Sequence, residues 1–431
     1  MKKGLLALSP IFALVALLIG FSIYYHGVSN APLLLIFLLT AIVAIISTRG
    51  EKLIDRIAIF SSGAGSKNLL LMVWIFVLAG SFAATAKEMG AAEAMVDMTL
   101  QLLPARFALV GLFLAACVTS LCMGTSVGTI VALMPIAAGL AEKTEMALPM
   151  VAAAVVGGAF FGDNLSFISD TTIVSTQTQG CKLSDKFRFN VLMVLPAALI
   201  VSVLYVFMGS EATEISSGSG VGWWKVIPYL VVLVCAAAGV NVLVVLVFGN
   251  LLTCATGMID GSFELLDWIN SSLQGVMGMA ELILISMIAG GIFALISHNG
   301  GLDFVIERIT RRVKTRAGAE MSICSLVAFA NICTANNTIA ILSVGDITRR
   351  ISERFEIDPR RSASLLDTTS CFVQGILPYG AQLLMASGLA GISAMSIVPY
   401  LYYPMLLALA VLTTILSGVV RAKGRSQSSQ G

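Results

Sequence analysis

The sequence predicts an all-α polytopic membrane protein made of two inverted-topology repeats, each with five spans and one re-entrant helical hairpin. Apolar runs recur along the chain, several are interrupted by polar residues, and the second half repeats the element order of the first. Hydrophobic residues make up 58% of the 431 residues and charged residues 12%, and the mean hydropathy is +0.94. Soluble domains are about 45–50% apolar and about 25% charged, so this composition excludes an ordinary soluble domain.

Uninterrupted apolar segments of roughly 20 residues predict simple spans. They are residues 5–25, 31–48, 69–87, 188–209, 277–297 and 397–419. The run 225–257 is too long for one crossing, and Gly239 and Asn241 near its middle predict two abutting short helices. The first segment has a basic start but no small-residue cleavage site, so we interpret it as a span and not as a signal peptide.

Four longer segments are interrupted. Residues 148–178 and 361–392 contain Gly, Asp or Pro within apolar surroundings, and they predict broken helices. Residues 106–141 and 318–352 each consist of two apolar stretches around a polar tip. A helical hairpin that enters and leaves on one side fits these two segments, because non-helical backbone is tolerated in a membrane where protein buries it.

Basic residues predict the orientation. With ten crossings, two hairpins and both termini in the cytoplasm, all but four of the 26 Lys and Arg residues fall on the cytoplasmic side, Lys186 and Arg361 among them. The exceptions are Lys87, Arg106, Lys143 and Lys225. We therefore expect a multi-pass protein of the cell (cytoplasmic) membrane. The Arg-rich connector 308–316 predicts an amphipathic helix on anionic lipid.

An internal repeat gives the domain organisation. Thr129-Ile130-Val131 matches Thr338-Ile339-Ala340, Pro10 matches Pro228, and Glu142, Glu145 and Pro149 fall opposite Glu353, Glu356 and Pro359. Five crossings per half is an odd number, so the second half is expected to be inverted, as in many carriers. The predicted parts are the first repeat 1–209, a linker 210–224, the second repeat 225–420 and a cytoplasmic tail 421–431.

The stretch 157–180 is the most polar of the apolar segments. It contains Asp163, Asn164 and Asp170 among many Ser and Thr residues, and Gly157, Gly158 and Gly162 precede the first Asp. An ionised Asp at a membrane helix centre costs about 2.5–3.5 kcal/mol or more, so a compensating partner is expected. A helix broken in mid-membrane frees backbone carbonyls and directs helix dipoles at one point, as transporter ion sites do.

Oxygen ligands from both halves predict a midplane cation site, because a hard cation such as Na⁺ is bound by carboxylates, hydroxyls and carbonyls. The candidate cation- or proton-binding residues are Asp163, Asn164, Ser166, Ser169, Asp170, Thr171 and Asp367. The hairpin tips add Thr125, Ser126, Thr129, Asn336, Asn337 and Thr338, and the second broken helix adds Thr368, Gln374 and Pro378. Glu281 lies near a span end, where its side chain is expected to reach the outer surface.

Other chemistry has little support in the sequence. The eight cysteines form no CxxC pair and are expected to be free thiols packed as small hydrophobes, and His26 and His298 are expected to be interfacial. No HExxH, GxSxG or phosphate-binding loop occurs, so ATP-driven transport is not supported. We expect no enzyme activity, no cofactor and no nucleic-acid partner.

The segment Gly158-Ala159-Phe160-Phe161-Gly162-Asp163-Asn164-Leu165-Ser166-Phe167-Ile168-Ser169-Asp170-Thr171-Thr172 resembles a signature of the NhaC family of Na⁺/H⁺ antiporters. The run 365–380 is similar to the family's second signature. Phe167 stands where the family often has Pro, Leu366 where it often has Glu, and Leu377-Pro378-Tyr379 replaces Ile-Pro-Trp. The resemblance implies Na⁺ and H⁺ as transported ions, hairpin tips and broken helices as the site, and possible homodimers that move as elevators.

Three functions are compared. The first is a secondary antiporter that exchanges Na⁺ for H⁺ at Asp163 and Asp170. The second is a Na⁺-coupled carrier of a small organic acid or amino acid, which the absent Glu and the amide-rich second tip favour. The third is an intramembrane aspartyl protease that uses Asp163 and Asp367, although Asp367 lacks a Gly-Asp context and proteolysis does not require the hairpins.

Overall fold

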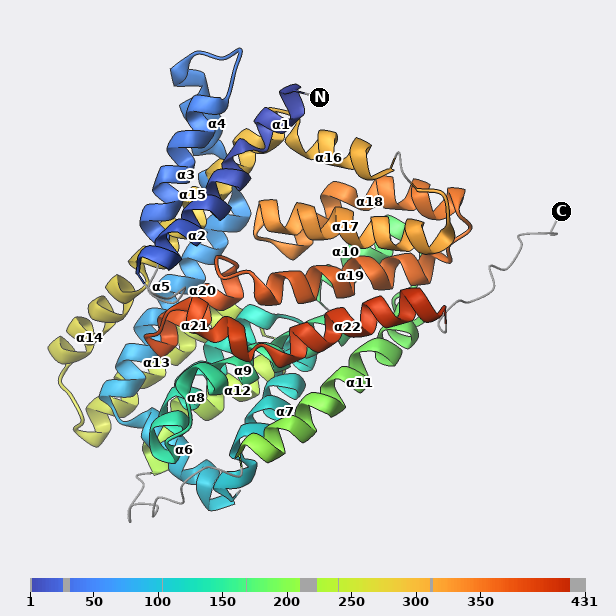
Figure 1. Ribbon diagram of the computed structural model, residues 1–431. Coiled ribbons are helices and arrows are strands. Elements are labelled where there is room, and N and C mark those ends of the chain that lie inside the picture. The colour runs from blue at the N-terminus through green and yellow to red at the C-terminus, as the bar shows by residue number, and fades with distance from the viewer. Residues whose placement is uncertain are drawn as a thin grey trace.

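The computed structural model is helical throughout the residues that it describes, which are 2–25, 32–102, 104–167, 169–209, 223–238, 240–310 and 313–418 (Figure 1). Several predictions fall on other residues: His26, Gly239, the tail 421–431, nearly all of the linker 210–224 and part of the connector 308–316 lie outside the described residues. No strand occurs within the described ranges.

The first part of the chain forms eleven helices. They are α1 (Lys2–Ala7), α2 (Ser9–Tyr24), α3 (Leu33–Ser47), α4 (Leu53–Ala64), α5 (Lys67–Glu88), α6 (Ala91–Leu102), α7 (Ala105–Met123), α8 (Ser126–Thr144), α9 (Leu148–Leu165), α10 (Asp170–Gln179) and α11 (Leu183–Gly209).

The second part forms a similar series. It contains α12 (Trp223–Ala237), α13 (Val242–Asp260), α14 (Leu265–Gly278), α15 (Ala280–His298), α16 (Gly301–Thr310), α17 (Arg316–Thr334), α18 (Asn337–Arg354), α19 (Pro359–Ile376), α20 (Ala381–Ala390), α21 (Ala394–Ile397), the 3₁₀ turn η2 (Val398–Tyr400) and α22 (Tyr402–Ser417).

Eight helices or near-continuous helical runs in the described part are long and apolar enough to cross a membrane, or nine if the bent run Pro359–Tyr400 counts as one span. The apolar helices α2, α3, α12 and α22 are shorter than this length. The helices thus define a multi-pass membrane protein, while the ten predicted crossings include four elements that are short for a full span. The predicted break in residues 225–257 lies between α12 and α13.

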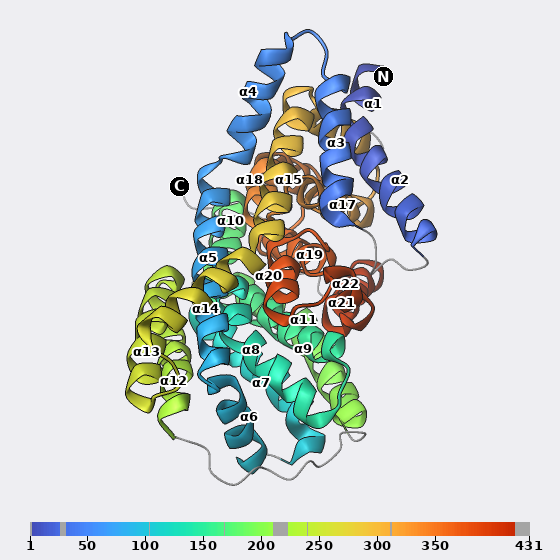
Figure 2. The ribbon, with the colours of Figure 1, turned by 90° about the vertical axis from the view of Figure 1, so that its left-hand side faces the viewer.

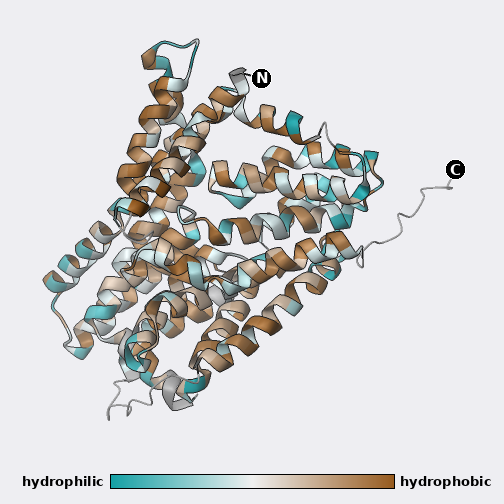
Figure 3. Cartoon of the chain, viewed as in Figure 1, coloured by the Kyte–Doolittle hydropathy of each residue, from teal (hydrophilic) through white to brown (hydrophobic). Residues whose placement is uncertain are grey.

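Apolar side chains cover the outside of the long helices. Phe12 and Ile19 of α2, and Leu199 and Phe207 of α11, are large and exposed. Figure 3 shows that hydrophobic residues predominate along these helices, whereas hydrophilic residues gather towards helix ends such as that of α18. A surface of this kind is solvated by lipid tails and not by water.

The helix order of the first part recurs in the second. Two close helix contacts join the two parts, and they involve corresponding helices. α5 packs against α14, where a Cβ built on Gly80 would lie 2.4 Å from the carbonyl oxygen of Gly275. α15 packs against α4 in the corresponding way, with a Cβ built on Gly63 lying 2.5 Å from the carbonyl oxygen of Gly290. Figure 2 shows these four helices together. Small residues permit such close backbone approach between membrane helices.

The turns define the register of this repetition. Gly124 (φ 65°), Ala335 (φ 49°) and Glu145 (φ 55°) each end a helix in the left-handed conformation, and Glu356 (φ 52°) is left-handed two residues after the end of α18. Counted from Gly124 and Ala335, Thr129 stands opposite Ala340, whereas the sequence repeat pairs it with Thr338. Glu145 and Glu356, which the sequence repeat sets opposite each other, both have left-handed backbone.

The centre of the molecule is formed by α9 and α19. α9 contacts α7, α8, α11, α19, α20 and α22, and its residues Val151–Gly158 are all buried. α19 contacts α9, α17, α18 and α22. Because both central helices end within the protein and not at its surface, their ends can carry polar groups that neither lipid nor water reaches.

The glycine contact between α5 and α14 should be sensitive to a single methyl group. In Gly275→Ala the new Cβ would lie 2.1 Å from the carbonyl oxygen of Gly80, so one helix must move. We expect a loss of about 1–3 kcal/mol of stability, measured as a lower midpoint of thermal unfolding in detergent. Gly278→Ala on the same helix meets no atom within 4 Å and should melt like the wild type. Equal melting of the two variants would contradict the packing.

Candidate functional site

Two central helices are broken in the interior. α9 ends at Leu165, and Ser166 and Ser169 have extended backbone before α10 starts at Asp170. α19 ends at Ile376, and Leu377 and Gly380 are extended before α20 starts at Ala381. Pro378 lies in this second break, where its missing N–H cannot continue the helix. Each break leaves terminal carbonyls and N–H groups without helical partners.

Two helix pairs bring their tips to these breaks. α7 and α8 are joined at Gly124 and Thr125, and α17 and α18 at Ala335 and Asn336. The Asn336 Oδ1 caps α18 by accepting a hydrogen bond of 2.9 Å from the backbone N–H of Ile339. Ala335 holds a left-handed conformation that costs a residue with a Cβ about 1–2 kcal/mol, which gives the second tip a local strain that Gly124 avoids.

A cavity of about 240 Å³ lies where both breaks and both tips meet. Many of the residues predicted from the sequence line it. These are Thr125, Ser126, Asp163, Asp170, Thr171, Asn336, Asn337, Thr338 and Gln374. The remaining wall consists of Asn68, Leu71, Met72, Gly124, Val127, Ala335, Ala381 and Gln382. The cavity therefore has two carboxylates and many neutral oxygens, and no Lys, Arg or His is among the described residues that line it.

Asp163 is the buried carboxylate of this cavity. It is 5% exposed, and its Oδ2 accepts a hydrogen bond of 2.8 Å from the Ser126 hydroxyl. Its Oδ1 accepts one of 2.5 Å from the Ser169 hydroxyl, which itself lies 3.0 Å from Thr171 Oγ1. No ion pair joins Asp163 to a basic side chain among the described residues. Two hydroxyls orient this carboxylate, but they do not neutralise it.

Amides of the second half extend this network. The Gln382 Nε2 donates to Ser126 Oγ at 3.0 Å, and the Gln374 Nε2 donates to Gln382 Oε1 at 2.9 Å and to the Ala335 carbonyl at 2.8 Å. The chain of hydrogen bonds thus runs from the second tip through α19 and α20 to Asp163. Gln374 Oε1 is buried without a donor in the described part of the chain, so it is an acceptor still available to a ligand.

Asp170 differs from Asp163 in its surroundings. It is the first residue of α10 and is exposed, although it lines the same cavity. A carboxylate at this position is favoured by the partial positive charge of the helix N-terminus. Asp170 therefore adds negative charge to the cavity at a small desolvation cost.

The other predicted residues lie beside the cavity and not on its wall. The Ser166 Oγ donates to the Leu121 carbonyl, and the Thr129 Oγ1 donates to the Thr125 carbonyl. The Thr368 hydroxyl is buried with no hydrogen-bond partner in the described chain. Asn164 and Asp367 belong to a second polar cluster.

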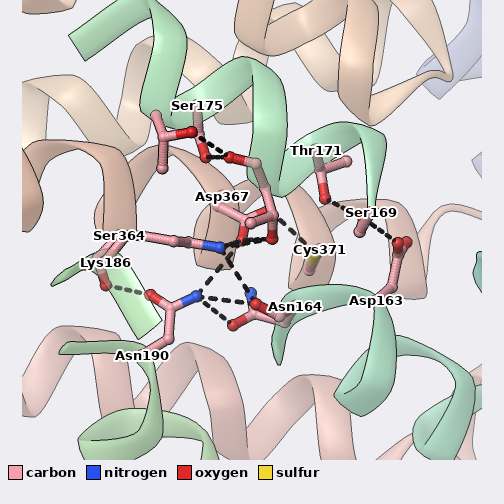
Figure 4. A network of polar contacts seen from close by, with 12 residues as sticks. Asp163, Asn164, Ser169, Thr171, Ser175, Lys186, Asn190, Ser364, Asp367 and Cys371 are labelled. Atoms are coloured by element: carbon pink, nitrogen blue, oxygen red, sulfur yellow. Dashed lines mark hydrogen bonds and ion pairs between the residues drawn. The ribbon is translucent and has the colours of Figure 1, made fainter. Parts of the chain in front are cut away.

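This second cluster joins α9, α10, α11 and α19 (Figure 4). Lys186 of α11 forms an ion pair with Asp367 of α19, and Lys186 Nζ also donates to Thr172 Oγ1 at 2.7 Å and to the Asn164 carbonyl at 3.2 Å. The Asn190 Nδ2 donates to Asn164 Oδ1 at 2.8 Å, and the Ser364 Oγ donates to Asn190 Oδ1 at 2.5 Å. Asp367 is thus already compensated by a protein ammonium group.

Sequence reasoning placed Lys186 in a cytoplasmic loop, whereas the structure buries it at 1% exposure within α11. Arg361 was counted on the cytoplasmic side too, but it is buried in α19 and paired with Glu320 of α17 at 3.1 Å. The sequence did contain an indication that Lys186 is buried. Lys186 and Asn190 are one helical turn apart at the start of a span, so the two polar side chains lie on the same face of the helix. Glu320 was a further acidic residue inside an apolar segment.

The cysteines and Glu281 agree with expectation. All eight cysteines are free. Glu281 is exposed in the first turn of α15, away from the cavity. No cysteine is among the described residues that line the cavity.

The site cavity adjoins a larger one. This second cavity of about 590 Å³ lies between α4, α5, α15 and the tip of α17 and α18. It shares Asn68 and Asn336 with the site cavity, and His298 lies on its wall.

Apolar spans around a buried, acidic cavity with broken helices define a polytopic membrane transport protein. The chain belongs to the Na⁺/H⁺ antiporter family, whose model matches residues 4–210 and 213–421. The family resemblance found in the sequence is thereby confirmed.

Individual relatives are distant. The Na⁺/H⁺ antiporter NhaC of Bacillus subtilis (strain 168) is 23% identical over 83% of this chain and 85% of its own length. The malate-2H⁺/Na⁺-lactate antiporter of the same organism is 21% identical over 78% of this chain and 79% of its own length. Among solved structures, the YdaH transporter of Alcanivorax borkumensis aligns with 84% of this chain and 88% of that chain, with 13% identity and a TM-score of 0.39.

Ser126 is the contact between Asp163 and the second half, so its hydroxyl can be tested directly. We expect Ser126→Ala to raise the KM for Na⁺ by about tenfold, because the carboxylate loses one of its two orienting donors. Na⁺-dependent pH changes in everted vesicles measure this value. Ser325→Ala, which removes an exposed hydroxyl bonded only to its own helix, should leave the KM unchanged. An unchanged KM in Ser126→Ala would remove Ser126 from the site.

Proposed function

We propose that this chain exchanges Na⁺ for H⁺ by secondary active antiport, and that the two ions bind alternately at Asp163. One observation carries this proposal: Asp163 is a buried carboxylate on the wall of a cavity, held by two hydroxyls and paired with no basic side chain in the described chain. The family supports the activity, and the geometry supports the residue.

The exchange follows from the cost of burying a charge. An ionised carboxylate in a poorly solvated site is unfavourable by several kcal/mol, and either a bound cation or a proton removes that cost. The two ions compete for the same oxygens, so binding one excludes the other. A site that moves across the membrane only when Asp163 is neutralised would couple Na⁺ movement in one direction to H⁺ movement in the other.

The remaining Na⁺ ligands are proposed from both halves. Hard cations prefer oxygen ligands, and Ser126, Asp170 and Thr171 supply them from the first half. Gln374 supplies its unpaired Oε1 from the second half. Counted from the turns at Gly124 and Ala335, Gln374 corresponds to Asp163, so the two sides of the cavity would present a charged and a neutral oxygen. Asp163 is the buried carboxylate of this ligand set, the exposed Asp170 is a second carboxylate on the same wall, and the other ligands are neutral oxygens, which suits a hard cation.

Two inverted-topology repeats are part of the proposal. The recurring helix order, the paired contacts Gly80–Gly275 and Gly63–Gly290, and the two segments matched by the family model support them. We propose that α7–α8 and α17–α18 are re-entrant hairpins, because their tips end at an interior cavity. The proposed parts remain residues 1–209, a linker 210–224, residues 225–420 and a tail 421–431.

We further propose that both termini lie in the cytoplasm, on the basis of the basic loops. Without Lys186 and Arg361, which are buried and paired, the excess of basic residues on that side persists. The larger cavity would then be the entry from one side, because it meets the site at Asn68 and Asn336. Homodimers are proposed on the family resemblance alone.

A Na⁺-coupled carrier of a small organic acid or amino acid is the second candidate. The cavity of about 240 Å³ favours it, because one water takes up only about 30 Å³ in the liquid. A relative that is named as a malate and lactate antiporter points the same way. Against it, no basic side chain lines the cavity to pair with a solute carboxylate. Na⁺-stimulated uptake of a labelled solute without pH exchange would select this candidate.

The proteolytic alternative loses its support. An aspartyl dyad requires two carboxylates that share a proton. Here Asp367 is paired with Lys186, and Asp163 with Ser126 and Ser169. We therefore propose that the chain is not an enzyme and uses no cofactor, and that Na⁺ and H⁺ are its cargo.

Asp163→Asn should abolish Na⁺-dependent proton movement in everted vesicles, since the amide is nearly isosteric but can neither bind a proton nor neutralise Na⁺. The measurement is dye-reported pH recovery on stepwise addition of Na⁺, Li⁺ and K⁺. Asp303→Asn is the matched control, because Asp303 is exposed on α16. Activity like that of the wild type in Asp163→Asn would reject the proposed role of this residue.

A further inference from the structure

Lys186 is the fully buried ammonium group beside the proposed site. It lies on α11 in the first half, and its partner Asp367 lies on α19 in the second half, so the pair crosses the boundary between the halves. Both side chains are 1% exposed or less. Figure 4 shows Lys186 directed at Asp367 and towards the break between α9 and α10. Burying an ammonium group costs desolvation free energy even when the group is paired, so its presence here indicates a role beyond stability.

The contacts of Lys186 converge on the broken helix. Its Nζ donates to the carbonyl of Asn164, one residue after Asp163 and among the last residues of α9, where carbonyls have no helical partner. The same nitrogen donates to Thr172 in the first turn of α10. One ammonium group therefore holds both sides of the break that orients Asp163. Asn190 reinforces it by donating to the same Asn164 carbonyl at 3.0 Å.

The pair also separates the roles of the two buried carboxylates. Asp367 has the ammonium group of Lys186, whereas Asp163 has hydroxyls alone. Three further titratable groups interact electrostatically with the pair. The Cys371 thiol of α19 has its Sγ 3.8 Å from Asp367 Oδ1, the Cys181 thiol lies before α11 near Lys186, and the Tyr403 hydroxyl of α22 is near Asp367. Of the two buried carboxylates, an ion that entered from the cavity would thus find only Asp163 uncompensated, beside the exposed Asp170 on the same cavity wall.

We propose that Lys186 is a fixed positioning cation: it holds the α9–α10 break so that Asp163 faces the cavity, and it keeps Asp367 out of ion exchange. This inference rests on the proposed role of Asp163. It states that Lys186 stays charged through the transport cycle and that the exchanged proton resides on Asp163. The second half thereby controls the geometry of the binding carboxylate of the first half through one ion pair.

Replacement by arginine separates a fixed cation from a proton carrier, because a guanidinium group does not lose its proton in proteins. The variants Lys186→Arg, Lys186→Met and Lys186→Met/Asp367→Asn are purified as full chains and reconstituted into liposomes with an internal pH dye. Lys182→Met is the control, since Lys182 is exposed just before α11. Na⁺ titrations at several pH values give KM, kcat and the pH profile, and Na⁺-induced stabilisation against heat reports binding without transport.

Lys186→Arg is expected to exchange Na⁺ for H⁺ with the pH profile of the wild type. Lys186→Met should raise the KM for Na⁺ by about tenfold to a hundredfold and alter the pH profile, because Asp367 is left uncompensated and the break loses its donor. The double variant, which removes both charges, should recover the pH profile while its KM stays raised. Lys182→Met should match the wild type.

Two outcomes overturn the proposal. The first is a Lys186→Arg or double variant that is folded and is stabilised against heat by Na⁺, but moves no protons. The lysine itself would then carry the exchanged proton. The other is a Lys186→Met variant with the KM and pH profile of the wild type. Should arginine be too large for the buried site, the double variant decides. A failure of the proposed function is distinguishable, because it appears as absent exchange in the wild type or retained exchange in Asp163→Asn.

Discussion

The structure depends on the cost of burying an ionised carboxylate that no basic side chain of the described chain neutralises. Asp163 is buried at the end of α9, and its hydrogen bonds come from two hydroxyls. Hydroxyls orient a carboxylate but leave its charge in place, so the site is most stable with a proton or a small cation present. That preference gives the family's exchange activity a physical basis in this chain.

The architecture supports this carboxylate by ending helices inside the protein. α9 and α19 stop at Leu165 and Ile376, and the tips of α7–α8 and α17–α18 meet them there. The helix ends at these breaks and tips free backbone groups that lipid could not satisfy. Lys186 bonds to the Asn164 carbonyl at the end of α9, Ser166 to the Leu121 carbonyl in the last turn of α7, and Gln374 to the Ala335 carbonyl in the second tip. The polar centre is therefore a consequence of the broken helices as much as of its acidic residues.

Asp163 and Asp367 show how strongly the surroundings decide the role of one residue type. Both are aspartates in central helices of an apolar chain, and the sequence treated them alike as cation-binding candidates. Asp367 meets Lys186 from a different half, while Asp163 meets a cavity. A compensated carboxylate has little to gain from Na⁺, whereas an uncompensated one has much. This contrast explains why a cation would bind at Asp163 and not at Asp367.

The class of protein, the helix breaks, the two polar tips and about half of the cavity wall could be predicted from the amino-acid sequence. This was possible because apolar length, Gly and Pro interruptions and hydroxyl-rich tips are local properties of the chain. The family followed from the run around Asp163 for the same reason.

Tertiary structure alone decided which charges meet. Lys186 pairs with Asp367 and Arg361 with Glu320, and each pair joins helices that are distant in sequence. A basic residue at the start of a span can be exposed in a loop or buried in the protein. No local sequence pattern distinguishes the two cases, because burial depends on the helices that pack around the residue. The choice of Asp163 as the uncompensated carboxylate is thus a property of the packed molecule, since it follows from where the available ammonium group lies.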